Sequence, residues 1–587
     1  MRVRSGHICA AISFLMSVAV SAAPASASTV AAAPASTTAA AEGVHGINVM
    51  SADWSCDTLA IAAAARDGLD HVQLSHRIVH SLCSVRDTAT AELVRSLTRF
   101  AHERGIAQVC AWDHALYDTD YYPDRFKVPG TGLLDLDNPG FWEWMKQDYR
   151  EMLALCPEID GLVLTFVESG SRVEDNFSVM SVPERLAKVI NTVSEVVCGE
   201  SGKTLWLRTF AYNEEEYGNI TACFNLVKWD DERMFLMVKD VPHDFFLYHP
   251  DNPYIGRLGH PTLVEFDACG EYNGQSVILN TLPDYFCERW SRYVRMPEVV
   301  GYVARTSRCV NDEITGTPAE INLYALRRAS EEPGIDADRI LDEFIIERYG
   351  AKAVKHLKAA FKASRDIIDG TMYPLKLNAT HHSDFRLDDP STYGRHVSGR
   401  WTDSDSVWIG HGVDRQLHWW TDIVNTLSPA GCKRPGGNRE REIAGVLEKG
   451  WLSDTEDMTE EYLDYVMEWQ RDCRRGAVRG FRHLKRARRM LEADSYTQLF
   501  DLYERSLMCL DLRSAASVCY WGARIWDRGE SFRTRSLARK MRRACRSMEK
   551  SQVLYESYDK PYPAGTWDFK SDASAARSYY EHALEVL

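Results

Sequence analysis

Carboxylates gather just beyond two apolar runs in the middle of the chain, and their type and spacing suit acid–base chemistry. Asp240 and Asp244 follow the run FLMVK, while Glu265, Asp267 and Glu271 lie in and after the run TLVEF. Ionised carboxylates are costly to remove from water without partners, so acids in such places need a reason. Hydrolysis of a glycosidic bond supplies one, because one acid protonates the leaving oxygen and another activates water.

Short apolar runs between residues 44 and 320 must position these acids. We expect eight strands, at Gly46–Met50, His71–Leu74, Ile106–Trp112, Gly161–Val167, Thr204–Tyr212, Met234–Lys239, Thr262–Phe266 and Val299–Ala304. Helical spacing fills the intervals, for instance at Ala91–Glu103, Phe141–Leu155 and Pro183–Val197. Eight such β/α units predict a (β/α)8 TIM barrel. A doubly wound open sheet is the alternative, but no Gly-rich phosphate turn follows the first strand.

A TIM barrel carries its functional side chains at or just beyond the carboxyl ends of its strands. The residues that meet this condition are Asp113, Glu168, Arg208, Tyr212, Asp240, Asp244, Glu271 and Arg305. Glu168 ends the apolar run GLVLTFV, which suits the raised pKa of a proton donor. Glu265 and Asp267 share one face of a strand, so we interpret both as structural. For Glu168, a salt bridge inside the barrel is the alternative role.

Four segments in consistent order resemble the glycoside hydrolase family 67 α-glucuronidases. MVKDVPHDF at 237–245 is similar to the family's VQ(I/V)KNGPxDFQ, and VEFDACGEYNGQ at 264–275 to its (L/M)EFQITQEYLGQ. LRTFAY at 207–212 is similar to LRAFVY, and LTFVE at 164–168 to a VKxxSE strand end. The helical stretch NLYALRRASEEPGIDADRILDEFIIERYG extends the likeness, which covers roughly residues 140 to 380.

The resemblance implies an inverting α-glucuronidase-like hydrolase that releases a uronic acid from glycan oligosaccharides and needs no cofactor. It implies Glu168 as general acid, and Asp244 and Glu271 as the pair from which the water-activating base comes. Arg208 and Lys239 would bind the uronate carboxylate, as an Arg or Lys in a fixed position can. Alternatively, both cations pair with acids in the barrel mouth. Tyr212 and Trp112 complete the substrate-binding candidates.

The chain departs from the family pattern at several positions. Asp240 stands where the family has Asn and adds a negative charge beside Lys239, which would weaken carboxylate binding unless Asp240 points away. Thr165 stands near a family lysine, Ser169 follows the acid rather than preceding it, and no family-type domain precedes the barrel. The expectation is a divergent relative. A glycosidase for a different sugar and a catalytically inactive carbohydrate-binding protein remain the alternatives.

The N-terminal segment and the net charge indicate where the protein is located and which partners are disfavoured. Met1 to Ala27 has the pattern of a signal peptide and 28–43 that of a flexible leader, so we expect a secreted or periplasmic protein. Loss of Arg2 and Arg4 takes the net charge from −15 to −17, which disfavours nucleic acid and anionic membranes as partners.

Two further patterns concern metals and thiols. His76 and His80 have the spacing of a zinc-protease pair, but Arg77 replaces the required Glu, so we expect no metal. Cys110, Cys156 and Cys509 fall in apolar runs and are expected to be buried thiols.

Beyond the barrel of 44–320, residues 321–587 are mainly helical in pattern. The expected helices include Glu320–Ser330, Ala337–Tyr349, Ala353–Ile368, Thr459–Val478 and Ser495–Arg524. A long polar interval, Thr380–Gly437, interrupts them. A homodimer through this helical region is one possibility that the sequence leaves open.

Overall fold

A computed structural model describes most of the chain beyond the leader. The described residues are 43–211, 214–229, 231–242, 244–249, 251–308, 312–373, 383, 459–563 and 567–587. Val44–Leu587 form one compact unit. The expected signal peptide and leader, up to residue 42, lie outside the described residues, as does the interval Thr380–Gly437 apart from Ser383.

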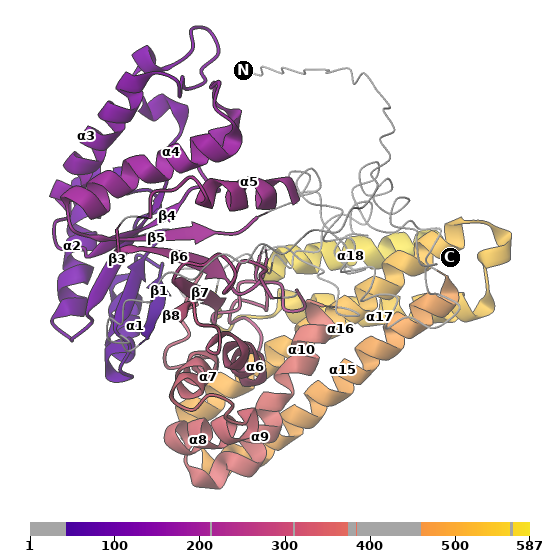
Figure 1. Ribbon diagram of the computed structural model, residues 1–587. Coiled ribbons are helices and arrows are strands. Elements are labelled where there is room, and N and C mark those ends of the chain that lie inside the picture. Colours follow the sequence, from indigo (N-terminus) through magenta and orange to yellow (C-terminus); the bar gives the residue numbers. More distant parts are fainter. Residues whose placement is uncertain are drawn as a thin grey trace, which may run out of the picture. The chain divides into compact units, whose positions relative to one another are not determined.

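The first half of the unit is a closed barrel of parallel strands (Figure 1). The strands are β1 (Val44–Val49), β2 (His71–Leu74), β3 (Gln108–His114), β4 (Gly161–Thr165), β5 (Thr204–Thr209), β6 (Met234–Lys239), β7 (Thr262–Asp267) and β8 (Val299–Arg305). Each strand pairs with the next in the sequence, and β8 closes the barrel on β1. The prediction of a (β/α)8 barrel is confirmed, and two strands have the predicted bounds.

Within the described residues a helix follows each of these strands except β6, which a long loop joins to β7. The helices are α1 (Trp54–Arg66), α2 (Thr88–His102), α3 (Pro139–Leu155), α4 (Val182–Ser194), α5 (Glu214–Phe224), α6 (Pro283–Tyr293) and α7 (Glu320–Glu331). Side chains of Asp53, Asp87 and Asn138 accept hydrogen bonds from the first turns of α1, α2 and α3, which fixes where these helices begin. The α4 helix continues into a π-helical turn, Glu195–Glu200.

Inward-facing side chains follow the period of two that strands impose. One apolar layer fills the barrel interior with Cys110, Trp112, Val163, Trp206, Met237, Leu263 and Val303. Two residues further along β5, β6, β7 and β8 stand Arg208, Lys239, Glu265 and Arg305, which therefore face the same interior. The strand period thus places a charged layer directly on the apolar core.

Close approach of two strands requires a glycine at position 161. A Cβ atom built there lies 2.4 Å from the Thr204 carbonyl oxygen on β5 and 3.0 Å from the Cys110 sulfur on β3. We therefore expect Gly161→Ala to lower the free energy of unfolding by about 1–3 kcal/mol, because two paired strands must separate to admit the methyl group. Denaturant unfolding measures this. Gly199→Ala is the control, since its Cβ meets nothing within 4 Å, and an equal effect of both substitutions would contradict the steric argument.

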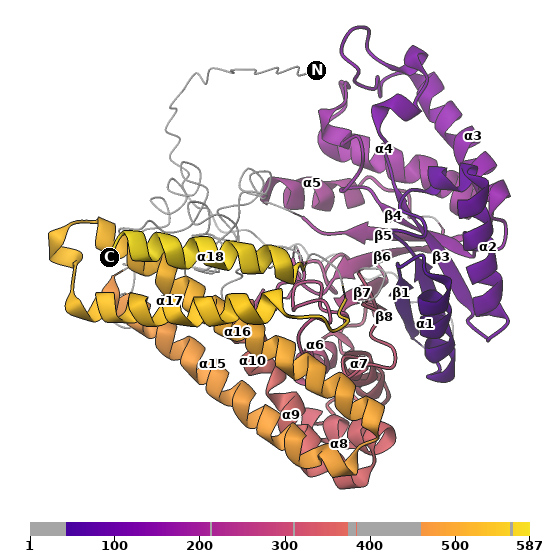
Figure 2. The ribbon, with the colours of Figure 1, turned by 180° about the vertical axis from the view of Figure 1, so that it is seen from behind.

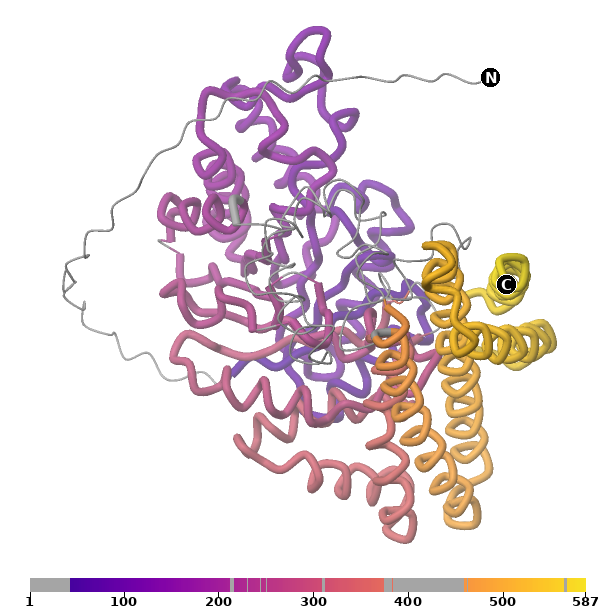
Figure 3. The backbone as a smooth tube through the Cα atoms, turned by 90° about the vertical axis from the view of Figure 1, so that its right-hand side faces the viewer, coloured from indigo at the N-terminus to yellow at the C-terminus, as the bar shows by residue number. Residues whose placement is uncertain are grey.

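The second half of the unit is helical, as the sequence predicts. Its longer helices are α8 (Ala337–Tyr349), α9 (Val354–Lys362), α10 (Ser364–Thr371), α15 (Glu460–Ala487), α16 (Ala493–Asp527), α17 (Arg535–Glu556) and α18 (Phe569–Glu585). The predicted helix Ala353–Ile368 is two helices, which break at Ala363. Figures 2 and 3 show α15, α16 and α17 as long helices side by side.

Among the described residues, no helix is long and apolar enough to cross a membrane. Cys110, Cys156 and Cys509 are buried free thiols, as expected.

Candidate active site

A cavity of about 690 Å³ opens at the carboxyl ends of the barrel strands. Its lining consists of His76, Arg77, His80, Trp112, His114, Val167, Glu168, Ser169, Gly170, Arg172, Arg208, Lys239, Asp244, Glu271, Arg305 and Arg308. The cavity brings together the three predicted catalytic carboxylates, Glu168, Asp244 and Glu271. It also contains the predicted substrate-binding residues Arg208, Lys239 and Trp112. Tyr212 lies outside the described residues.

At the base of the cavity is the charged layer Arg208, Lys239, Glu265 and Arg305, which we call the ionic layer. Nε of Arg208 donates to Glu265 over 2.7 Å, and Nε of Arg305 donates to the other Glu265 oxygen over 2.9 Å. Burial opposes ionisation of Glu265, but the charges of Arg208, Arg305 and Lys239 outweigh it and hold its pKa below the usual value. Glu265 is therefore a structural counter-ion, as its place on the strand predicts.

Aromatic rings hold the cations of the ionic layer from the side. The Arg208 guanidinium lies 4.6 Å from the centre of the Trp112 ring, and the Lys239 ammonium 3.8 Å from that of Phe210. Trp112 is almost completely buried, and its indole N–H donates to Gln73 over 3.0 Å. Such contacts favour a positive charge in a site from which water is excluded. They leave Trp112 more a support for Arg208 than an open platform for a sugar.

Glu168 is the most accessible of the three carboxylates. The β4 ladder ends at Thr165, earlier than predicted, so Glu168 stands in the loop that follows. Its side chain is 40% exposed, and one oxygen lies 3.3 Å from Nη1 of Arg208. Glu168 therefore lies between the Arg208 guanidinium and the open cavity, and not only beside the apolar run that the sequence suggests. This position is open to the cavity, as the expected role of proton donor requires.

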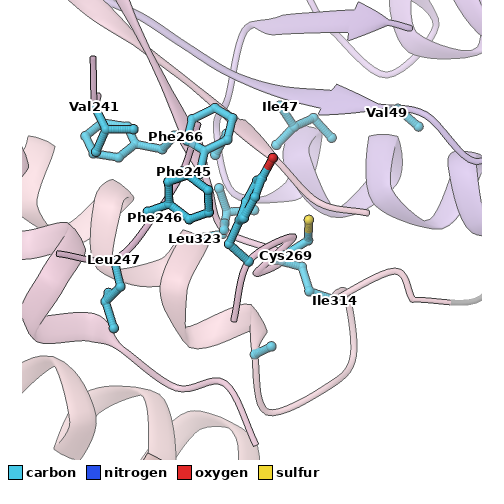
Figure 4. Close-up of a cluster of buried hydrophobic side chains, with 14 of the residues drawn as sticks. Ile47, Val49, Val241, Phe245, Phe246, Leu247, Phe266, Cys269, Ile314 and Leu323 are labelled. Atoms are coloured by element: carbon cyan, nitrogen blue, oxygen red, sulfur yellow. The ribbon is translucent and has the colours of Figure 1, made fainter. Parts of the chain in front are cut away.

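Asp244 lies in the loop after β6 and is nearly buried. Nζ of Lys239 donates to its Oδ1 over 2.9 Å. The next three residues, Phe245, Phe246 and Leu247, pack into an apolar cluster that also contains Cys269 of the following βα loop (Figure 4). Three buried apolar anchors directly after one acid fix the position of its carboxylate.

Glu271 lies in the loop after β7 between two arginines. One oxygen accepts from Nη1 of Arg305 over 2.5 Å and the other from Nε of Arg308 over 2.6 Å. Asp267, below it, accepts from the backbone N–H groups of Gly270 and Glu271 over 3.1 and 2.7 Å and so shapes the loop. Burial, and then the neighbouring Glu271 carboxylate, raise the pKa of Asp267.

Two of the candidate acids point out of the barrel. Asp240 comes directly after Lys239, and successive side chains of an extended chain point to opposite faces. Its carboxylate accepts from the Tyr285 hydroxyl over 2.7 Å, and Arg289 lies 3.6 Å away. Burial raises its pKa to about 6. Asp113 likewise accepts from the Leu82 N–H over 2.8 Å and from two tyrosines. The interpretation of Asp113 as a functional residue of the cavity is therefore wrong, and Asp240 does not oppose Lys239.

His76, His80 and His114 form one wall of the cavity, and the sequence analysis singled out the first two of them but not His114. His80 and His114 stack with ring centres 3.9 Å apart, and His76 lies 5.2 Å from Trp112. Burial lowers the pKa of all three, to about 4 for His114, so they are neutral near pH 7. Within the described residues no group of three His, Cys, Asp or Glu side chains is suited to a metal ion. The spacing of His76 and His80 showed only that they share one loop.

The helical half of the unit holds the two loops that carry Asp244 and Glu271. The Tyr373 hydroxyl, just after α10, accepts from the Leu247 N–H over 3.2 Å and donates to the Tyr272 carbonyl over 3.0 Å. Ser383 donates to the Glu271 carbonyl over 2.8 Å. These hydrogen bonds join the backbones of both acid-bearing loops to residues more than 100 positions later in the chain.

Loss of the Tyr373 hydroxyl should therefore loosen both loops. We expect Tyr373→Phe to lower the free energy of unfolding by about 1–3 kcal/mol, because the buried Leu247 N–H loses its acceptor. Denaturant unfolding gives this value. Tyr555→Phe is the matched control, since this buried tyrosine belongs to α17, remote in the sequence from both loops. If the Tyr373 variant is as stable as the wild type, the hydroxyl does not hold the loops together.

Comparison with known proteins adds to this geometry. The sequence matches no protein-family model and no curated protein. The fold is similar to that of a glycoside hydrolase family 138 enzyme targeting pectin rhamnogalacturonan II. The TM-score is 0.48 and the identity 12%, over 88% of this chain and 62% of that one. It is also similar to a family 115 4-O-methyl-α-glucuronidase with specificity for decorated arabinogalactans, with a TM-score of 0.46 and 10% identity.

That second similarity covers 92% of this chain and 61% of the family 115 chain. The chain therefore spans less than two thirds of the length of either protein. Both are glycoside hydrolases, but at these identities and TM-scores the likeness concerns the fold alone. It does not single out family 67.

Proposed function

We propose that this protein is an exported glycoside hydrolase that releases a terminal uronic acid from glycan oligosaccharides. The observation that carries the proposal is the cavity itself, in which three carboxylates face four cations that strands and loops hold in place. The carboxylates supply the acid and base of glycoside hydrolysis. The cations suit a sugar that brings a negative charge of its own.

Binding of the sugar carboxylate falls to the cavity face of Arg208 and Lys239. Both cations already contact protein acids, Arg208 with Glu265 and Lys239 with Asp244. An Arg has five N–H donors and a Lys three, so each keeps donors for a ligand after these contacts. The protein acids thus hold the cations in position before the substrate arrives, which lowers the entropy cost of binding.

The roles of general acid and base follow from the exposure of the three carboxylates and from the charges around them. Glu168 is the general acid, because its accessible side chain faces the cavity where the leaving oxygen must lie. Asp244 is the base. Both oxygens of Glu271 are engaged by guanidiniums, which makes Glu271 a poor proton acceptor. Glu271 instead keeps Arg305 and Arg308 in place. The resemblance to family 67 supports an α-linkage and inversion at the anomeric carbon.

Hydrolysis of two matched disaccharides tests this function. One carries an α-linked terminal glucuronic acid on a neutral sugar, and the other is its carboxyl-reduced counterpart with terminal glucose. We expect kcat/KM to favour the acid by at least about 100-fold, since buried charged groups that lose their partner discriminate strongly. Equal rates would identify a glycosidase for neutral sugars. Binding of the acid without turnover would identify a carbohydrate-binding protein.

Export is a separate part of the proposal and rests on the N-terminal sequence. We expect the mature protein to begin after Ala27, and N-terminal sequencing of protein recovered from outside the cytoplasm checks this. An intact Met1 in that material would contradict it.

A further inference from the structure

Charges around the cavity floor balance in the resting protein. The cations are Arg208, Lys239, Arg305 and Arg308, and the carboxylates that contact them are Glu168, Asp244, Glu265 and Glu271. The three cavity histidines add no charge near pH 7, because burial lowers their pKa. Asp267 accepts hydrogen bonds from the backbone of its own loop, and burial raises its pKa, so we count it apart from these eight groups although its carboxyl lies within electrostatic reach of Arg305. With all eight groups ionised, the floor is neutral.

Catalysis changes this balance by one unit. A general acid must carry its proton when the substrate binds, so Glu168 is then neutral and the floor has one excess positive charge. One carboxylate on the terminal sugar compensates that charge. This step rests on the proposed function. The balance of charges therefore accounts for one anionic group on the substrate, and every cation of the floor is then matched by a negative charge.

The positive charge of Arg77 is not part of this balance. It lines the same cavity at an exposed position, and no side chain among the described residues forms an ion pair with it. Arg172, a half-buried arginine of the lining, contrasts with it, since Arg172 pairs with Glu174 and with Glu216 at 2.8 Å. With no ion-pair partner in the described part of the chain, Arg77 adds a further positive charge at the lining of the cavity.

The turn that carries Arg77 is fixed rather than loose. The Ser75 hydroxyl donates to Asn48 over 2.6 Å, and the Arg77 N–H donates to the Met50 carbonyl over 3.3 Å. His76 has a φ of +50°, a backbone conformation that residues other than glycine seldom adopt. The buried side chains of Ile78 and Val79 follow directly. A fixed turn holds Arg77 in a defined place.

The position of this turn relates Arg77 to the floor. His76, the residue before Arg77, lines the same cavity as Arg208, Arg305 and Arg308, and burial together with these charges lowers its pKa. His76 also lies 5.2 Å from the Trp112 ring. Arg77 lies three residues after the end of β2 and is an exposed residue of the cavity lining.

We propose that Arg77 binds a second anionic group, carried by the sugar to which the terminal uronic acid is attached. The preferred substrate is then a glycan with acidic groups on two adjacent sugars. The second group is a carboxylate or a sulfate ester, since a guanidinium pairs with the oxygens of either. The floor selects the sugar that is released, and Arg77 selects the sugar that remains.

Steady-state kinetics on three disaccharides test this proposal. All carry α-linked terminal glucuronic acid, and the second sugar is neutral in the first, a uronic acid in the second and a sulfated neutral sugar in the third. We expect Arg77→Gln to raise KM about 5-fold for a doubly acidic substrate, with kcat unchanged and no effect on the first. The substrate that responds, the second or the third, identifies the anionic group.

The control is Arg295→Gln. Arg295 is also exposed and without an ion pair among the described residues, but it precedes β8 at the opposite end of the barrel and does not line the cavity. It should change none of the three KM values. The Arg77 effect should also shrink in 0.5 M salt, because exposed charges are screened.

Two results would overturn the proposal. Equal changes on all three substrates would make Arg77 a general positioning residue, and no change on any would remove it from the site. In either case hydrolysis of the first substrate by the wild type leaves the proposed function intact. If the wild type neither binds nor cleaves any of the three, the proposed function fails and this inference fails with it.

Discussion

Glu168→Gln is expected to lower kcat on an oligosaccharide with an ordinary sugar leaving group by about 10²–10⁴-fold. Glutamine has nearly the same shape but no proton to give, so the leaving oxygen must depart as an alkoxide. KM should change little, because Glu168 does not belong to the ionic layer, in which Glu265 still pairs with Arg208. Initial rates of uronic acid release measure the effect.

An activated substrate separates proton donation from other roles of Glu168. A nitrophenyl leaving group is stable as an anion and needs no acid, so Glu168→Gln should retain most of its activity on a nitrophenyl glucuronide. If the variant loses both activities equally, Glu168 acts at another step, such as substrate positioning. Ser169→Ala, at the adjacent lining residue, should leave both rates close to those of the wild type.

Asp244→Asn is expected to reduce kcat by a similar factor, about 10²–10⁴-fold, for ordinary and activated leaving groups alike. The base acts on water and not on the leaving group, so a better leaving group cannot compensate for its loss. Added azide should restore part of the activity of this variant, because a small anion that is already nucleophilic needs no base. The product would then be a glycosyl azide.

Glu271→Gln separates the two candidate bases. Removal of this charge leaves Arg305 and Arg308 without their shared carboxylate, so the main expected effect is a change in KM. Azide should not rescue this variant. If azide rescues Glu271→Gln and not Asp244→Asn, the base is Glu271 and the assignment from hydrogen-bond engagement is wrong.

The alternation of apolar runs and helical spacing predicted the barrel, because parallel strands buried on both faces are apolar over most of their length. The same pattern predicted the position of the site, since the strands of a barrel end at one rim. Lys239, Asp244 and Glu271 therefore came together as expected. Strand alternation would also have predicted the ionic layer, as Arg208, Lys239, Glu265 and Arg305 each stand two residues beyond a core position.

Other features of the site depend on contacts that no local pattern encodes. Asp113 lies near the end of β3 and turns outward to Tyr117 and to Tyr149, and Tyr149 comes from α3, 36 positions later in the chain. Arg308 and His114 were missed because neither belongs to a motif. The contact of Tyr373 with both catalytic loops joins residues more than 100 positions apart, which sequence periodicity cannot predict.

The central claim is that the cavity hydrolyses an α-linked terminal uronic acid by a single displacement with water. Proton NMR of the first minutes of hydrolysis of an α-linked aldobiuronic acid tests it most directly, because the anomers of the released sugar give separate signals before they equilibrate. The account predicts that β-glucuronic acid appears first. Initial release of the α-anomer, or no release by the folded protein, would contradict it.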